Sequence, residues 1–420
     1  MGRKTDAGFG ERQTNPQVMP KLLQLDTCLG VGSTGRIAEI IGDLARQAGW
    51  HTYMGHGSRY RGSSTMVSIQ VGSKLDEYRH YFASRIFDRH GLESSNATHK
   101  FIERIEEIKP DVVHIHNIHG YYANYRLLFQ YLSEKGIPTV MTMHDFWLMT
   151  GHCAYIDQLC SKWEIGCGHC PRLGGYPASI LDRTHQNWVL KKALLGSFEK
   201  DKLILVPVSY WLEGYVRQSF LASCTLFTIQ NGVNTNMIRP YEGEHSELWK
   251  EIDWTKHTII TVADRWTDAN GYDDIIRLCR ILPDDMQVVM VGLNGQQLKN
   301  LPPRIVGVGH TNSVRQLVEL YTSADVLFNS STEVTFGLVT AEAMACGTPA
   351  IVFKNTAGEE IIDEDTGYAI DRLEEIPKLV YECRENATAF KVKCRNRIVN
   401  SFDSIRQYSK YIDLYNRLLR

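Results

Sequence analysis

Short apolar runs alternate with helix-like segments along most of this chain, and this alternation limits its possible folds more than any other feature. The strands expected in the first half are residues 22–25, 112–116, 138–143 and 203–208. Those expected in the second half are residues 258–262, 287–291, 305–308, 325–329 and 349–353. Short apolar runs separated by helices are typical of parallel sheets covered on both faces. The sequence therefore predicts an α/β protein with two doubly wound, Rossmann-like domains facing a cleft.

The chain length of 420 residues is too great for one core of ordinary size. We expect a disordered tail at residues 1–19 and a first domain at 20–210, which carries a cysteine-rich insertion at 150–185. A second domain is expected at residues 211–403, followed by a C-terminal helix at 404–420.

Charge and composition exclude several classes of protein. The formal net charge of −2 argues against nucleic acid as a partner, because binding to the phosphate backbone needs a basic excess. No apolar run reaches the length of a membrane span, and the first residues lack the apolar stretch of a secretion signal. We therefore expect a cytoplasmic protein whose ten cysteines are reduced or bind metal rather than forming disulfides.

The segment SSTEVTFGLVTAEAMACGTP, residues 330–349, carries the strongest functional signal. It predicts a turn at Phe336, Gly337 and Leu338 that opens a helix bearing Glu342. The start of a helix offers free N–H groups and a partial positive charge to a phosphate. A carboxylate one turn further can accept hydrogen bonds from two ribose hydroxyls, so the segment predicts a nucleotide site. The alternative is an ordinary strand–loop–helix in which Glu342 is solvated.

This segment resembles the EAMACGTP signature of the family four retaining glycosyltransferases, which have the GT-B fold, and the resemblance covers nearly the whole chain from Lys21. It implies that Glu342 binds the donor ribose, that the backbone at Gly337 and Leu338 meets the donor diphosphate, and that the C-terminal helix packs back toward the first domain. It further implies a nucleotide-diphospho-sugar donor, a saccharide or lipid-linked saccharide acceptor and no catalytic metal. The implied setting is the assembly of bacterial surface polysaccharide, with peripheral association at the inner face of the membrane.

A glycine-containing loop after the first strand includes Gly32, Ser33, Thr34 and Gly35 and leads into a helix that begins with Arg36. The loop matches the dinucleotide fingerprint only loosely, and no acidic residue ends the second strand region at residues 51–57, so binding of a nicotinamide cofactor is disfavoured. The resemblance implies that the loop faces the donor phosphate and the acceptor sugar. Arg36 is a candidate contact to phosphate or acceptor, or else a solvated arginine.

Histidines follow two of the expected strands. His144, in the run TMHDFW, lies at a strand end that should open into the cleft, and the resemblance implies contact with the transferred sugar. The alternative is a partly buried histidine satisfied by backbone groups. His114 and His116 share one face of their strand, but no third metal ligand lies at a suitable spacing. We therefore expect structural or acceptor-side roles for them.

Four cysteines lie in a loop-like stretch: Cys153, Cys160, Cys167 and Cys170. Four thiolates suit a tetrahedral structural zinc site, which would pin the insertion over the acceptor side. Capsular and colanic-acid-type transferases of the family carry a similar insertion. The alternative is four reduced thiols packed as small apolar side chains.

Two positions depart from the family pattern. Family members place an acidic residue eight positions before Glu342, where this chain has Val334, so the adjacent Glu333 is the candidate catalytic substitute. Arg265 matches the family's arginine at the donor diphosphate and is a candidate catalytic residue, whereas Asn270 replaces its lysine. Losing one stabilising cation costs on the order of 2–4 kcal/mol. These departures favour, as the alternative function, a non-catalytic sugar-nucleotide-binding scaffold on a GT-B frame.

Overall fold

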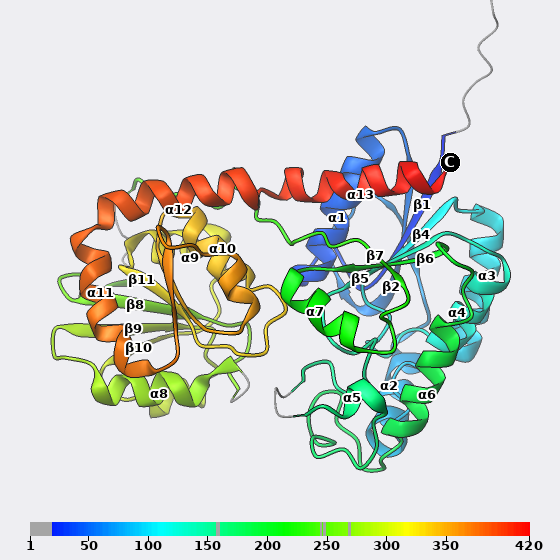
Figure 1. The fold of residues 1–420 in the computed structure, drawn as a ribbon, viewed down its shortest axis with the longest axis horizontal. Coiled ribbons are helices and arrows are strands. Elements are labelled where there is room, and N and C mark those ends of the chain that lie inside the picture. The colour runs from blue at the N-terminus through cyan, green and yellow to red at the C-terminus, as the bar shows by residue number, and fades with distance from the viewer. Residues whose placement is uncertain (1–18, 157–159, 244–245, 247–248, 268–269) are drawn as a thin grey trace, which may run out of the picture.

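The computed structural model describes residues 19–156, 160–243, 246, 249–267 and 270–420. The tail expected at residues 1–19 lies outside this part of the chain except for Met19. Two α/β domains lie side by side, and the last two helices, α12 (Ala387–Ser401) and α13 (Ser404–Leu418), run along one side of both (Figure 1).

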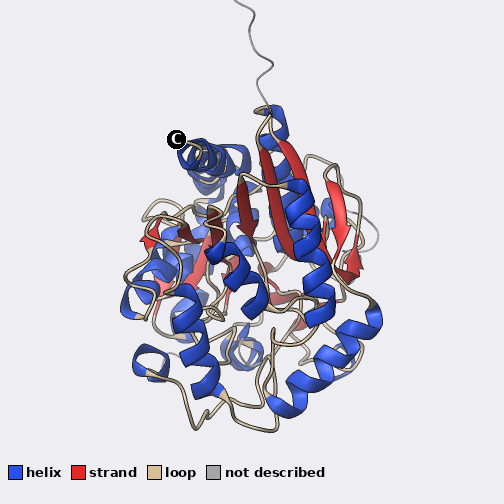
Figure 2. Ribbon diagram, turned by 90° about the vertical axis from the view of Figure 1, so that its right-hand side faces the viewer, coloured by secondary structure: helices blue, strands red, loops and turns tan. Residues whose placement is uncertain are grey.

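The first domain is built on a parallel sheet whose strands, among the described residues, have the order β3-β2-β1-β4-β5-β6-β7. The strands are β1 (Lys21–Leu29), β2 (His51–Arg61), β3 (Val67–Gln70), β4 (Val112–Ile115), β5 (Thr139–Met143), β6 (Leu203–Pro207) and β7 (Thr225–Leu226). The helices are α1 (Gly32–Gln47), α2 (Lys74–Phe87), α3 (Ser95–Ile108), α4 (Tyr125–Glu134), α5 (Lys162–Ile165), α6 (Thr184–Leu195) and α7 (Tyr210–Gln218). Helices lie on both sides of this sheet (Figure 2), which explains why β4, β5 and β6 are buried along their whole length.

The first domain extends beyond the predicted boundary at residue 210. Helix α7 begins at this position and β7 follows it, and β7 pairs with β6 through Ile204 and Thr225. A strand of two residues leaves too short an apolar run to be recognised in the sequence, which is why the boundary was placed too early.

The second domain is also built on a parallel sheet, with the order β10-β9-β8-β11-β12-β13 in the described residues. Its strands are β8 (His257–Val262), β9 (Met286–Val291), β10 (Ile305–Val308), β11 (Val326–Asn329), β12 (Ala350–Phe353) and β13 (Gly367–Ile370). Its helices include α8 (Tyr272–Ile281), α9 (Val314–Ser323), α10 (Leu338–Ala345) and α11 (Ile376–Glu385). The sequence predicted all of these strands except β13. The α/β class with two doubly wound domains is confirmed.

The C-terminal helix α13 packs against α1 of the first domain. Its buried tyrosines Tyr408, Tyr411 and Tyr415 share one apolar cluster with Trp50. The Tyr415 hydroxyl hydrogen-bonds with Nδ1 of His114 at 2.6 Å, and the ring of Tyr415 lies edge-on to Trp50. Because α13 follows α12 of the second domain, this contact fastens the end of the second domain to the first.

We predict that Tyr415→Ala lowers the free energy of unfolding by about 3–5 kcal/mol, as expected for loss of a large buried aromatic ring. The matched control on the same helix is Ile405→Ala, because the Ile405 side chain is 50% exposed. Equilibrium urea unfolding of both variants checks this. Equal losses in the two variants would contradict the role given to the α1–α13 contact.

Candidate functional site

A cavity of about 570 Å³, open to solvent, lies between the two domains. The first domain contributes Ser33 and Thr34 at the start of α1, and His144 and Asp145 after β5. The second domain contributes the ends of β8 and β11 and residues 334–339, which lead into α10. Both walls thus lie at the carboxyl ends of parallel strands, where doubly wound sheets bind ligands.

Two helix N-termini face this cavity. Helix α10 starts after Gly337, whose φ of 94° is in the left-handed region that favours glycine, and Phe336, Gly337 and Leu338 all line the cavity. Helix α1 starts at Gly32. Among the described residues, no side chain caps the start of either helix, so no side chain competes with a ligand for the N–H groups there. A phosphate or diphosphate between the domains would meet two partial positive charges.

The remaining residues of the glycine loop have separate structural roles. Gly35 is buried, and a Cβ at this position would lie 3.1 Å from Cβ of Cys28, so glycine lets the start of α1 approach β1 closely. Arg36 is exposed, and its guanidinium is near enough to Glu342 to lower the pKa of that carboxyl. The loop of the first domain and the signature helix of the second are therefore electrostatic neighbours.

Glu342 lies one turn into α10, behind Leu338. The hydroxyl of Tyr321 donates a hydrogen bond to Oε2 of Glu342 at 3.2 Å. Burial raises the pKa of Glu342 to about 7, although the Tyr321 hydrogen bond and Arg36 act in the opposite direction. The carboxyl group is thus oriented by one partner and poised to become a stronger acceptor when it ionises.

His144 lies where the sequence placed it, in the cavity wall. Nε2 of its ring is 3.3 Å from Nδ1 of His116, whose Nε2 is 2.8 Å from Oε1 of Gln24. The Gln24 amide nitrogen donates to Ala38 O, so Oε1 must accept the N–H of His116. His116 therefore accepts from Nε2–H of His144, which leaves Nδ1 of His144 as the acceptor. Burial lowers the pKa of His144 to about 4, so the ring is neutral at pH 7.

Asp145 and His119 form a polar pair at the same wall that the sequence interpretation missed. Nε2 of His119 hydrogen-bonds with Oδ2 of Asp145 at 2.7 Å, and both residues line the cavity. The available signal was the position of Asp145 directly after His144 at a strand end.

The candidate catalytic residues are His144, Arg265 and Glu333, and the last two do not line this cavity. Glu333 forms an ion pair with Arg172 of the insertion at 2.9 Å, while the neighbouring Val334 reaches the cavity wall. Arg265 lines two adjoining cavities instead. Asn270 does line the cavity, but its amide donates to the backbone oxygen of Arg265 at 2.5 Å, so it also holds its own turn.

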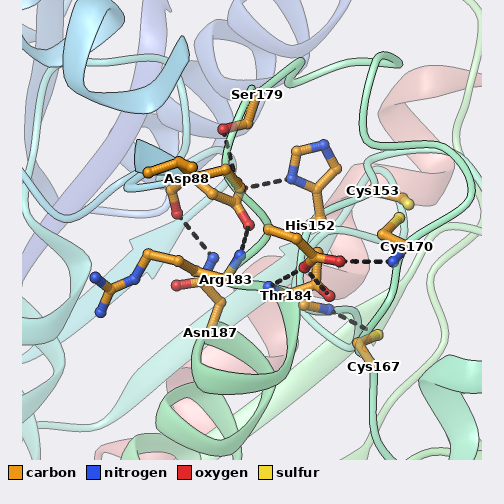
Figure 3. A network of polar contacts seen from close by, with 12 residues as sticks. Asp88, His152, Cys153, Cys167, Cys170, Ser179, Arg183, Thr184 and Asn187 are labelled. Atoms are coloured by element: carbon orange, nitrogen blue, oxygen red, sulfur yellow. Dashed lines mark hydrogen bonds and ion pairs between the residues drawn. The ribbon is translucent and has the colours of Figure 1, made fainter. Parts of the chain in front are cut away.

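The insertion, residues 150–185, is fastened to the end of α2 through Asp88 (Figure 3). Oδ1 of Asp88 lies 2.6 Å from Nδ1 of the buried His152, and Oδ2 accepts the backbone N–H of Arg183 at 3.0 Å. The backbone oxygen of Asp88 accepts from Nδ2 of Asn187 at 2.8 Å. One buried carboxylate residue thus connects both ends of the insertion to the first domain.

The four predicted zinc ligands, Cys153, Cys160, Cys167 and Cys170, line one small cavity inside the insertion. The side chains of Cys153 and Cys170 hydrogen-bond to each other, whereas Figure 3 shows the sulfur of Cys167 apart from this pair. In the described part of the chain, no three His, Cys, Asp or Glu side chains are grouped so that they could hold a metal ion. The residue types suit zinc, but their positions do not form a tetrahedral shell, so the zinc site stays a prediction.

Comparison with known proteins agrees with the geometry. Residues 256–385 match the family model of glycosyl transferases group 1. The chain is 24% identical over 376 residues to the putative colanic acid biosynthesis glycosyl transferase WcaC of Escherichia coli K12, a match that covers 86% of this chain and 89% of the relative.

Solved structures with a similar fold include sucrose-phosphate synthase from Thermosynechococcus elongatus, with a TM-score of 0.70, 16% identity and coverage of 95% of this chain and 99% of the other. Another is Anabaena HepE in complex with UDP, with a TM-score of 0.64, 14% identity and coverage of 95% and 100%.

The chain therefore has the GT-B glycosyltransferase fold that the sequence predicted. The match of residues 256–385 in its second domain to the model of glycosyl transferases group 1 confirms the resemblance. None of the described helices combines the length and apolar character needed to cross a membrane.

The raised pKa of Glu342 gives the first site prediction. If ribose hydroxyls donate to its carboxylate, affinity for UDP should fall by about tenfold between pH 8 and pH 6, because below a pKa of about 7 the carboxyl must lose a proton to bind. Calorimetry over this range checks it. Glu342→Gln, which cannot titrate, is the control for ionisation of the UDP phosphate itself. If UDP affinity changed equally with pH in the unmodified protein and in Glu342→Gln, the assignment of Glu342 to the ribose would be refuted.

Proposed function

We propose that this protein is a retaining glycosyltransferase that moves a sugar from a nucleotide-diphospho-sugar to a glycan or lipid-linked saccharide acceptor. The observation that carries the proposal is the cavity between the domains, which two helix N-termini face and which has Glu342 one turn behind. Support also comes from Anabaena HepE, whose structures contain UDP, glucose or UDP-glucose. The colanic acid assignment of the E. coli relative supports a role in bacterial surface polysaccharide.

In this proposal the donor lies mainly on the second domain. Glu342 holds the ribose, the amides at Gly337 and Leu338 meet the diphosphate, and the sugar points toward His144. Arg265 lies on the turn after β8, next to the cavity wall, and reaches the diphosphate when the domains close. The acceptor approaches from the first domain.

Catalysis would rest on positioning and on stabilising the leaving group. The acceptor hydroxyl oxygen bonds to the anomeric carbon while the bond from that carbon to the diphosphate oxygen breaks, and the hydroxyl proton passes to the departing diphosphate. The helix N-termini and Arg265 would stabilise the charge that develops there. No catalytic metal is required in this scheme.

Contacts across the cleft support closure of the domains. The hydroxyl of Thr335 donates to the backbone oxygen of His144 at 2.7 Å, and Glu333 pairs with Arg172. Glu360 of the second domain accepts the backbone N–H of Tyr210 at 3.0 Å. Closure would exclude the water that otherwise hydrolyses the donor. We further propose a cytoplasmic enzyme with peripheral association at the inner face of the membrane.

The alternative function is a sugar-nucleotide-binding scaffold. Val334 favours it because an apolar side chain occupies the cavity wall where an acidic group was expected. Asn270 favours it because its amide is already engaged by the turn.

Release of nucleotide from a panel of donor sugars, measured by mass spectrometry with and without acceptor extracts, separates the two functions. We expect acceptor-dependent release from at least one donor. Glu342→Ala should lower kcat/KM for that donor at least tenfold, since a charge-assisted hydrogen bond contributes about 1.5–3 kcal/mol. Glu359→Ala, at an exposed glutamate of the same domain, is the charge-matched control. Donor binding without release would favour the scaffold.

The zinc prediction has its own test. Elemental analysis of protein purified without chelators should find about one zinc per chain. Chelation should lower the midpoint of thermal unfolding without releasing nucleotide, because the insertion belongs to the first domain. Cys224→Ser, outside the group, should leave the zinc content unchanged, whereas Cys167→Ser should reduce it. If the purified protein contained no zinc, the result would instead favour the alternative of four reduced thiols packed as small apolar side chains.

A further inference from the structure

A second cavity adjoins the one between the domains. Asn117, His119 and Tyr176 line both, so a ligand bound in the second cavity can extend into the first. Its other walls come from the end of β2, from α2, from the loop after β4 and from the insertion. All of its lining residues except Arg265 come from the first domain, so it lies mainly on the side opposite the proposed donor site.

Tyrosines form much of its wall. Tyr60, Tyr81, Tyr121 and Tyr176 all line the cavity, and Tyr60 and Tyr176 are 55% and 46% exposed. Tyr121 has a φ of 69°, an unusual conformation for an aromatic residue, and its ring lies edge-on to Tyr81. Aromatic side chains with one apolar face and one polar hydroxyl suit a saccharide, which has both C–H faces and hydroxyls.

The charge of the lining is positive. Three arginines, Arg59, Arg85 and Arg265, face one glutamate, Glu77, so the lining carries two positive charges in excess. Glu77 is buried and already pairs with Nε of Arg59 at 3.1 Å. Among the described residues, the structure shows no side-chain hydrogen bond or ion pair for Arg85 or Arg265. Because Arg265 is assigned to the donor diphosphate, the Arg85 guanidinium remains at this cavity for an anionic group of the ligand.

We propose that this second cavity is the acceptor subsite and that it takes a saccharide carrying an anionic group, either a phosphate or a carboxylate. The inference rests on the proposed function, because it assigns the acceptor of the same reaction. The tyrosines hold the sugar ring, Arg85 binds the anion, and the shared wall at Asn117 and His119 leads the acceptor to the donor sugar.

The test uses the full-length protein with UDP present at a saturating concentration, so that the donor phosphate site is filled. Glucose 1-phosphate, glucuronic acid and glucose are the three probes, and their affinities are measured by NMR titration. We expect at least one anionic probe to bind at least tenfold more tightly than glucose, with a preference that weakens at high salt. Comparison of the two anionic probes separates a phosphate from a carboxylate.

Substitutions in the lining of the second cavity test whether the probes bind there. Arg85→Gln should remove the preference for the anionic probe, whereas Arg79→Gln, at an exposed arginine of the same helix, should retain it. Tyr60→Ala should weaken glucose and the anionic probe alike, and its exposed ring makes loss of folding a minor concern. Equal binding of glucose and both anions, or an unchanged preference in Arg85→Gln, would overturn the proposal. Failure of UDP itself to bind would count against the proposed function, while the probe affinities still decide the acceptor cavity.

Discussion

The alignment of two uncapped helix N-termini on one cavity is the constraint on which the rest of the site depends. Parallel strands deliver both helices with their N-termini at the carboxyl edge of each sheet, and the facing arrangement of the sheets brings these edges together. Gly337 makes the start of α10 possible through its left-handed backbone. A diphosphate there would take the place of the missing side-chain caps, because its oxygens would accept hydrogen bonds from backbone N–H groups at the two helix starts.

The proposed reaction requires that the two walls of the cleft stay aligned while the domains move relative to each other. Helix α13 provides the permanent connection through Tyr411 and Tyr415, both buried in the first domain's apolar cluster. The contacts near the ligand are few and polar, such as Thr335 with His144 and Glu333 with Arg172. Such contacts are easier to break and remake than apolar packing, which fits the domain closure that we propose.

The apolar runs predicted the parallel sheets and most of their strands, because central strands such as β6, β9 and β12 are mostly apolar and buried. The runs missed β3, whose residues are mostly exposed, and β7, which is only two residues long. They also missed β13, where Gly367 and Tyr368 interrupt the apolar pattern. The signature segment predicted the start of α10 and the position of Glu342. No local pattern could predict the pairing of Glu333 with Arg172, or the tyrosine-lined cavity, because their members come from segments far apart in the sequence.

A crystal structure of the protein with UDP would test the central claim most directly. The account predicts the ribose hydroxyls on the carboxylate of Glu342 and the diphosphate against the backbone at Gly337 and Leu338, facing the start of α1. A diphosphate bound only at Gly32–Gly35, with the ribose far from Glu342, would contradict it. So would a nucleotide in the tyrosine-lined cavity of the first domain, which the account reserves for the acceptor.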